Sequence, residues 1–370
     1  MQFIVQKDHI YNALNAVSKA TAVRGIQPVL ANVLIEAAGS EQIRLCATDL
    51  DISIEITIPA EVKNPGSTTL PAKKLTEIVA KLPDKSVNFD LNSENNITVI
   101  TCGKSKFDIV GISSNEFPTV THLESNENID IKITTLLKAI KEVSFAAATY
   151  DTNNVLSGVY FEVIGNNLEM AATDGNRLAR TVKELENTIN KDYSIVIPVR
   201  TLVEFSRILT GVTDNDVTIT IKNAQISFKL KDRCLTSRLL EGTYPKYKQL
   251  IPAGNDLVAL ADKDSLIAAL ELTSTMVNER TSIIKLLFND NKLELTADTP
   301  DLGDSSDHID VEYSGQELKV AFNYKYILDT LKVLDTDKVR IEMNGPLSPT
   351  LFKPEDKENY LCLIMPVQVR

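Results

Sequence analysis

The sequence is poor in residues that bind metals or take part in redox chemistry. It has no tryptophan, three histidines and four cysteines. No two cysteines lie close together and no two histidines have the spacing of metal ligands, so zinc and redox motifs are missing. We therefore expect no metal site, and we interpret the cysteines as buried free thiols of a reducing compartment. The residues concerned are Cys46, Cys102, Cys234, Cys362, His9, His122 and His308.

Motifs of catalysis and of cofactor binding are missing as well. No two of the 14 glycines form a G-x-G pair, and neither a Walker loop nor a G-x-S-x-G elbow occurs. We predict no catalytic residue and no cofactor. Residues 174–177, Asp-Gly-Asn-Arg, resemble a site, but they follow a predicted strand and are interpreted as a turn. An acidic cluster leaves a metal-dependent enzyme open as one alternative; its residues are Asp301, Asp304 and Asp307.

No stretch is long and apolar enough to predict a membrane span, and residues 1–8 lack the plan of a signal peptide. We expect a cytoplasmic protein without a membrane partner. The 370 residues, 43% of them hydrophobic, predict two to three globular domains. The formal net charge of −11 would argue against nucleic-acid binding if it were evenly distributed.

Internal repetition is the main positive signal. Three similar segments, each made of two apolar runs joined by a turn, end at Asp49, Asp174 and Asp298, which are 125 and 124 residues apart. A second set of similar segments recurs with nearly the same period: 70–75, 197–202 and 322–327. This period is too long for a solenoid unit and has the size of a domain.

The repeat predicts an α+β fold with three copies of one domain, at residues 1–126, 127–253 and 254–370. Each copy opens with a short strand and an amphipathic helix, whose apolar residues recur every three or four positions. A second helix and strands of alternating polarity follow. We therefore expect two helices packed on antiparallel sheets in each copy.

Charge is distributed unevenly between helices and strands. The six predicted helices, with their ends, contain 14 basic and 8 acidic side chains, so they carry +6 while the rest of the chain carries −17. A shared helix surface of this kind would attract phosphates without distinguishing bases. On charge alone, solvated helix faces are an equal alternative. The helices are predicted at 7–24, 72–82, 134–148, 199–210, 263–280 and 324–334.

Four motifs, in order along the whole chain and without large gaps, resemble those of bacterial DNA polymerase III beta subunits, the beta sliding clamps. Residues 172–179, ATDGNRLA, resemble the A-T-D-G-x-R-L-A signature of the middle domain. Residues 70–74, LPAKK, resemble the V/L-P-A-R/K-K segment. Residues 242–247, GTYPKY, resemble the G-x-F/Y-P-x-Y segment, and Met365-Pro366 resembles the M-P terminus.

The resemblance implies a processivity factor that is not an enzyme. Such clamps are head-to-tail homodimers, whose six domains of the DNA clamp fold form a ring around double-stranded DNA, with helices inside and sheets outside. They slide independently of sequence and tether the replicative DNA polymerase, the clamp loader and repair proteins through short linear motifs. A repeat-built protein-interaction scaffold that does not encircle DNA is the alternative.

The resemblance also implies functional residues. DNA contacts are implied at Arg24 and Lys73, with Arg200 and Arg207 as basic positions on the matching helix of the middle domain. The dimer interface joins Lys74 and Phe107 of one chain to Met276 of the other. A partner-peptide pocket is implied between the second and third copies, at Leu156, Thr173, Gly175, Arg177, Leu178, Pro245, Leu250, Leu347, Met365 and Pro366.

Some of these pocket positions have an ordinary structural alternative. Core packing is a strong alternative for Leu156 and Leu178, whereas an arginine among apolar groups, as at Arg177, needs a specific reason. The family pattern is also broken at two positions, since Gln249 stands where several relatives have arginine and Asn176 where some have histidine. These departures concern the preference for partner motifs and not the fold.

Overall fold

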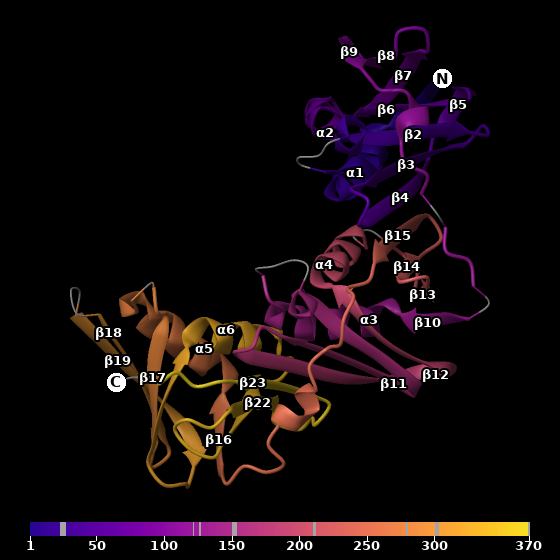
Figure 1. The fold of residues 1–370 in the computed structure, drawn as a ribbon. Coiled ribbons are helices and arrows are strands. Elements are labelled where there is room, and N and C mark those ends of the chain that lie inside the picture. The colour runs from indigo at the N-terminus through magenta and orange to yellow at the C-terminus, as the bar shows by residue number, and fades with distance from the viewer. Residues whose placement is uncertain are drawn as a thin grey trace. The chain divides into compact units, whose positions relative to one another are not determined.

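The computed structural model describes most of the chain. The described ranges are 1–22, 27–120, 122–125, 127–149, 154–209, 212–278, 280–299 and 303–368. Within these ranges the chain forms six α-helices and 23 β-strands, and the strands make three antiparallel sheets (Figure 1). The order strand, helix, strands, helix, strands occurs three times, as the sequence predicts.

The three repeats contain equivalent elements, except that the first has an additional strand, β5, and that in the second β11 spans the equivalents of β2 and β3 and β12 spans those of β4 and β6. The first repeat has β1 (Gln2–Gln6), α1 (Lys7–Val17), β2 (Asn32–Ala38), β3 (Gln42–Thr48), β4 (Ile52–Pro59), β5 (Glu61–Asn64), β6 (Gly66–Pro71), α2 (Ala72–Lys81), β7 (Ser86–Asn92), β8 (Ile97–Cys102) and β9 (Ser105–Val110). The second has β10 (Asn128–Lys132), α3 (Ile133–Val143), β11 (Gly158–Thr173), β12 (Arg177–Pro198), α4 (Val199–Ile208), β13 (Asp216–Lys222), β14 (Gln225–Lys229) and β15 (Arg233–Arg238). The third has β16 (Leu257–Asp262), α5 (Lys263–Thr273), β17 (Ile283–Asn289), β18 (Lys292–Thr299), β19 (Gly303–Tyr313), β20 (Leu318–Asn323), α6 (Tyr324–Val333), β21 (Lys338–Met343), β22 (Thr350–Pro354) and β23 (Tyr360–Ile364).

All six predicted helices are confirmed. The first helix of each repeat is shorter than predicted, because a 3₁₀ turn continues it: Ser18–Ala20, Ser144–Ala146 and Ser274–Met276. The predicted apolar faces are buried, as α1 shows with Ile10, Ala13, Leu14 and Val17. Two helices begin at side-chain caps, since Asp262 accepts a hydrogen bond from the backbone N–H of Ser265 and Asn323 from that of Lys325.

Within each of the three repeats, equivalent strands pair through equivalent residues. In each copy, the strand that opens the first apolar segment pairs with the strand that precedes the second helix. The equivalent pairs are Asn32 with Pro71, Gly158 with Pro198, and Ile283 with Asn323. In the second repeat, the turn that the sequence predicts between the two apolar runs falls at residues 165–167. It is not a break between strands, because β11 is continuous and its register with β12 shifts on both sides of Gly165.

The sheets extend from one repeat into the next. β15 of the second repeat pairs with β4 of the first, and β23 of the third repeat pairs with β12 of the second. Residues 1–133 and 200–239 form one compact unit, and residues 134–199 and 240–370 form another. The domain boundaries at 126/127 and 253/254 stay a prediction, because the middle repeat contributes to both units.

Each unit has its own sheets and helix pairs. The first unit holds the sheets β5-β1-β7-β8-β9 and β10-β13-β14-β15-β4-β3-β2-β6, and α1 packs beside α2 in it (Figure 1). The second holds the sheet β11-β12-β23-β22-β21-β16-β19-β18-β17-β20, and α5 packs beside α6. Stacked phenylalanine rings fill the first unit's core, with centroids 4.7 Å apart for Phe3 and Phe89 and 4.5 Å apart for Phe205 and Phe228.

All four cysteines are free; three are buried as predicted, whereas Cys234 is half-buried. In the described ranges, no helix has the length and apolarity needed to cross a bilayer. The same ranges contain no group of three or more His, Cys, Asp or Glu side chains placed to hold a metal ion.

Candidate partner-binding site and helix surface

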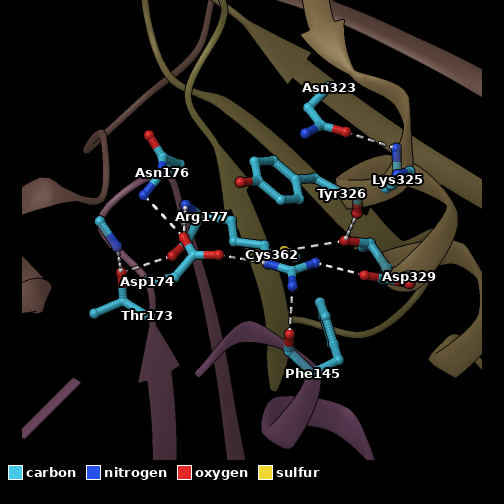
Figure 2. A network of polar contacts seen from close by, with 12 residues as sticks. Phe145, Thr173, Asp174, Asn176, Arg177, Asn323, Lys325, Tyr326, Asp329 and Cys362 are labelled. Atoms are coloured by element: carbon cyan, nitrogen blue, oxygen red, sulfur yellow. Dashed lines mark hydrogen bonds and ion pairs between the residues drawn. The ribbon is translucent and has the colours of Figure 1, made fainter. Parts of the chain in front are cut away.

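The turn between β11 and β12 is the centre of the candidate pocket (Figure 2). The Thr173 hydroxyl donates to the carbonyl oxygen of Arg177 at 2.6 Å and accepts from the backbone N–H of Gly175 at 3.1 Å. The Asp174 carboxylate accepts from the backbone N–H groups of Asn176 and Arg177 at 2.9 and 3.0 Å. Gly175 has φ +90°, a region that glycine occupies without strain. The turn predicted at 174–177 is confirmed.

Arg177 is 9% exposed and joins three segments of the second unit (Figure 2). Its Nε donates to Asp174 at 3.0 Å, its Nη1 to Asp329 of α6 at 2.7 Å, and its Nη2 to the carbonyl oxygen of Phe145 at 2.5 Å. The guanidinium also lies over the Tyr326 and Phe145 rings, 4.5 and 5.2 Å from their centroids. A buried charge is stable only when it is paired and hydrogen-bonded. These contacts therefore explain an arginine among apolar groups.

A tyrosine-rich segment after β15 lies beside this turn. The Tyr244 hydroxyl accepts a hydrogen bond from the backbone N–H of Thr173 at 3.1 Å, and the Tyr160 ring stacks on the Tyr244 ring at 5.5 Å. Leu178 is 1% exposed in the apolar cluster beneath this segment, so it is a core residue under the pocket. The cluster also includes Ala171, Val196, Tyr247, Leu351, Leu361 and Leu363.

Large apolar side chains are exposed around this buried floor. Nine such side chains are exposed in the described part of the chain, and three of them are predicted pocket residues: Leu250 at 58%, Leu347 at 60% and Met365 at 39%. The backbone N–H of Met365 donates to the carbonyl oxygen of Asn176 at 2.8 Å, which holds the C-terminal segment against the turn. Exposed apolar groups above an apolar floor suit the burial of a few peptide side chains.

The remaining predicted pocket residues lie at the margins of this arrangement. Pro245 is exposed next to Tyr244, while Leu156 and Pro366 are half-buried. The carbonyl oxygen of Leu156 accepts from the backbone N–H of Ala148 at 2.8 Å.

Several residues of the site were missed by sequence reasoning. Phe145, Tyr326 and Asp329 were not identified, because Asp329 is 152 residues from Arg177 and no local pattern relates them. Tyr244 lies inside the quoted GTYPKY motif, whose aromatic position was the available signal.

Glu169 anchors the tyrosine segment from below. Arg180 donates to its two carboxylate oxygens at 3.0 and 2.9 Å, Lys248 lies 3.2 Å from it, and the Tyr247 hydroxyl donates to it. Burial by itself raises the pKa of Glu169, but the hydrogen bonds from Arg180, Tyr247 and Lys248 outweigh burial and lower this pKa to about 2. Burial and the contact with Glu169 raise the pKa of Tyr247.

Three of the four predicted DNA-contacting residues, Lys73, Arg200 and Arg207, lie in the described part of the first unit. Their surroundings differ from one another. Lys73 of α2 is exposed and lines, with Lys19, an open cavity of about 380 Å³ between α1 and α2. Arg200 donates to Asp49 at 2.6 Å and to the carbonyl oxygen of Lys19 at 3.0 Å. Arg207 donates to Glu204 at 2.6 Å. Arg24 lies outside the described residues.

The arginine ion pairs do not withdraw the charges from solvent. The Arg200 side chain is 49% exposed and the Arg207 side chain 59%. Exposed ion pairs contribute little free energy, so a phosphate can compete with the carboxylates for these guanidinium groups.

The predicted dimer-interface residues lie at or near two strand edges. Phe107 of β9 is 38% exposed. Met276 is half-buried, and its methyl group lies beside Gly303 at the start of β19. Lys74 of α2 pairs with Glu77 at 2.9 Å.

Comparison with known proteins covers the whole chain. Family models described as the N-terminal, central and C-terminal domains of the DNA polymerase III beta subunit match residues 1–121, 130–246 and 248–368. The beta sliding clamp of Synechocystis sp. is 32% identical, and that of Staphylococcus aureus is 31% identical; both cover 100% of this chain, which spans 100% and 99% of their lengths.

Solved structures agree with this match. The DNA polymerase sliding clamp of Bacillus subtilis is 31% identical with a TM-score of 0.93, and each chain is covered completely. The DnaN sliding clamp of Bartonella birtlesii, bound to griselimycin, is 28% identical with a TM-score of 0.94 and the same complete coverage.

Changing Asp329 to Asn tests the role of the Arg177 bridge. We expect the free energy of unfolding to fall by about 1 to 2 kcal/mol, because a charged acceptor of a buried arginine is lost. Urea unfolding measures the change. Asp335→Asn is the control: it alters an exposed carboxylate just after α6 whose ion pair with Lys138 is open to solvent, so stability should change little. Equal stability of the Asp329 variant and the parent protein would show that the bridge is not stabilising.

The acid stability of the second unit depends on Glu169. Because its pKa is lowered in the folded state, its stabilisation is complete above the unfolded pKa, about 4.3, and is lost as the pH falls toward about 2. We expect Glu169→Gln to make unfolding free energy less steep in pH over that window, where one proton accounts for up to about 1.4 kcal/mol per pH unit. Glu184→Gln on β12 is the control. Parallel pH profiles for parent and Glu169→Gln would contradict this prediction.

Proposed function

Because the chain belongs to the family of DNA polymerase III beta subunits and is a beta sliding clamp, a processivity factor of DNA replication, we propose that two copies close head to tail into a ring around double-stranded DNA. The ring holds by topology and performs no catalysis. It tethers the replicative polymerase, the clamp loader and repair proteins through short linear motifs. The observation that carries the proposal concerns strand pairing between repeats. The same pairing occurs at two junctions within one chain, while the strand edges that would form a third junction are unpaired in the described part of the chain.

Two junctions between repeats are built in the same way, and a third is open. The last strand of the second repeat pairs with β4, and the last strand of the third repeat pairs with β12. The last strand of the first repeat, β9, is the edge of its sheet. Residues 303–310 of β19, equivalent to the covered parts of β4 and β12, pair with β18 alone among the described strands. A second copy completes this junction by placing its β9 on β19.

The repeat fixes the register of that pairing. Phe107 is equivalent to Leu235 and Cys362, because they face Ile100, Phe228 and Phe352 in the neighbouring strands. Ser305 is equivalent to Ile54 and Ala179, because the buried alanines Ala297, Ala47 and Ala172 face them in the neighbouring strands. Ile54 and Ala179 face Leu235 and Cys362 across the two existing junctions. Phe107 of one copy therefore faces Ser305 of the other, and Lys106 faces Ser306.

Charge supports the same register. In the first repeat, Arg44 pairs with Glu55 across β3 and β4. At the equivalent positions of the second repeat the signs are exchanged, and Arg180 pairs with Glu169 at 2.9 Å. In the third repeat the equivalent positions are Glu294 and Ser306, whose hydroxyl donates to Glu294 at 3.1 Å, so the cation of the other two repeats is replaced by a neutral side chain. Lys106 of the second copy supplies the cation that the third repeat lacks. Phe107 and Met276 add apolar contacts at the same interface.

Exchange of two charges tests the dimer. We expect Lys106→Glu or Glu294→Lys alone to weaken dimerisation by about tenfold or more, because like charges then lie on the same face of the joined strands. The double variant restores the affinity. Sedimentation equilibrium measures the dissociation constant, and Lys104→Asp in the preceding turn is the control. Single variants as tightly dimeric as the parent, or a double variant that stays weak, would reject the register.

Topology tests encirclement directly. We expect the loaded protein to remain on nicked circular DNA and to leave when the circle is cut, because a ring slides off a free end. Equal retention on both DNA forms would favour ordinary binding. Release of the protein at low salt with no preference for circles would favour the scaffold that does not encircle DNA.

Lys73 tests the helix surface. Replacing one phosphate-contacting lysine by alanine should reduce the slope of log affinity against log salt by about 1 and should do so on every DNA sequence. Lys63→Ala, on strand β5 instead of a helix, is the matched control and leaves the slope unchanged. A reduction that depends on the DNA sequence would argue for base contacts.

The pocket proposal rests on the exposed side chains Leu250, Leu347 and Met365 above the buried cluster. They offer apolar contact to anchor residues of a peptide, while Arg177 is occupied by Asp174 and Asp329. The griselimycin-bound relative supports ligand binding by a clamp of this fold.

A further inference from the structure

The turn after β3 repeats the pocket turn after β11. The Thr48 hydroxyl donates to the carbonyl oxygen of Ile52 at 2.9 Å and accepts from the backbone N–H of Leu50 at 3.0 Å. The Asp49 carboxylate accepts from the backbone N–H groups of Asp51 and Ile52 at 3.1 and 3.0 Å. These are the bonds that Thr173 and Asp174 make at the pocket, so the first junction between repeats has the same local framework as the second.

The apolar cluster beneath the turn is repeated too. A proline-preceding aromatic residue packs into it in both repeats, Phe117 in the first and Tyr244 in the second. The other equivalent members are Val29 with Val155, Leu34 with Tyr160, Cys46 with Ala171, Ile112 with Leu240, and Val120 with Tyr247. The wall of the pocket therefore has a counterpart at the first junction.

A cavity of about 230 Å³ lies at this counterpart, entirely within the first unit. The side chains relevant to binding are Leu50, Ile52, Pro118, Val120, Ser237 and Arg238. The cavity has room for one aliphatic side chain of a ligand. Two of its differences from the pocket change the charge, because Ile52 replaces Arg177 and Arg238 replaces Met365.

Leu50 is held in an unfavourable conformation and faces solvent. Its φ is +81°, where the equivalent residue of the pocket turn is Gly175 at +90°. Side chains other than glycine, asparagine and aspartate rarely adopt this region, because Cβ then crowds the backbone. The leucine is also 49% exposed, so packing within the chain does not account for it. Strain of this kind is found where a side chain is positioned for a ligand.

Arg238 adds a cation beside this leucine. Its side chain is exposed, and within the described ranges its guanidinium forms no hydrogen bond or ion pair. Its backbone N–H donates to the carbonyl oxygen of Asp51 at 2.9 Å, which fixes the arginine next to the turn. The other nearby arginine, Arg200, is paired with Asp49, and the exposed Asp51 carboxylate lies on the same rim. The unpaired guanidinium is therefore complementary to a ligand carboxylate.

We infer that this cavity is a second docking site, for an extended segment of a partner protein that presents one aliphatic side chain close to one carboxylate. The aliphatic side chain contacts Leu50 and Val120, and the carboxylate binds Arg238. The inference rests on the proposed function in one respect, since it takes the second junction to be a peptide pocket. Its ligand differs from that of the pocket, where a methionine stands in place of the arginine.

The test uses the full-length protein and a defined probe, the fluorescein-labelled peptide Gly-Leu-Ser-Asp-Gly with its C-terminus amidated. Fluorescence anisotropy measures its affinity. We expect Arg238→Gln to weaken binding about tenfold. Exchanging the peptide's Asp for Asn should weaken binding to the parent protein equally and binding to Arg238→Gln no further. Additive losses from the two changes, or no loss in Arg238→Gln, overturn the inference.

Leu50→Gly separates binding from stability. Glycine adopts φ +81° without strain, so we expect Tm to stay the same or to rise while affinity for the probe falls. A misfolded variant would instead lose both. Unchanged affinity in Leu50→Gly overturns the inference, and so does loss of binding caused by Met365→Lys, because that result places the probe in the pocket. Retention on nicked circles is measured in parallel, so that failure of the clamp proposal is recognised separately from failure at this site.

Discussion

Strand pairing between consecutive repeats is the interaction on which the other features depend. Unpaired strand edges invite association, and here the edges of β4 and β12 are covered by the last strand of the following repeat. That pairing also brings a turn from one repeat against the end of a strand from the next, as the hydrogen bond between Met365 and Asn176 shows. A candidate site therefore arises at each junction as a consequence of how the sheets are continued, and not as a separate structural addition.

The turns after β3 and β11 have the same framework, but their aspartates have different counter-ions. Asp49 is neutralised directly by Arg200 from the second helix of the next repeat. Asp174 reaches the equivalent helix of the third repeat only through Arg177, which bridges it to Asp329. Asp298 is paired with Lys285 of the neighbouring strand at 2.6 Å. In the first two repeats the aspartate makes the same hydrogen bonds to the turn, while its counter-ion differs between the junctions. This divergence explains how one ancestral fold provides sites of different character.

The sequence predicted the features that follow from local patterns. Apolar periodicity located the six helices, and the landmarks Pro71, Pro198 and Asn323 proved to be equivalent members of paired strands. The sequence did not predict the contacts between distant segments. Nothing in the local pattern relates Arg177 to Asp329, because their contact depends on how the third repeat packs against the second, or to Phe145, which is 32 residues away in the second repeat. The continuation of sheets across repeats was equally hidden, since strand pairing between copies leaves no periodic signal in either strand.

The charge sum on the helices also needs structural interpretation. Several of the basic side chains counted there are engaged by carboxylates, among them Lys74, Lys138, Arg200, Arg207 and Lys332. Such exposed pairs are weak, so these cations remain available but are partly neutralised before any phosphate approaches. Partial neutralisation of the cations suits a tether that must slide. Tight contact with phosphates would retain the protein at one position, whereas partly compensated cations attract the DNA backbone while allowing each contact to exchange rapidly.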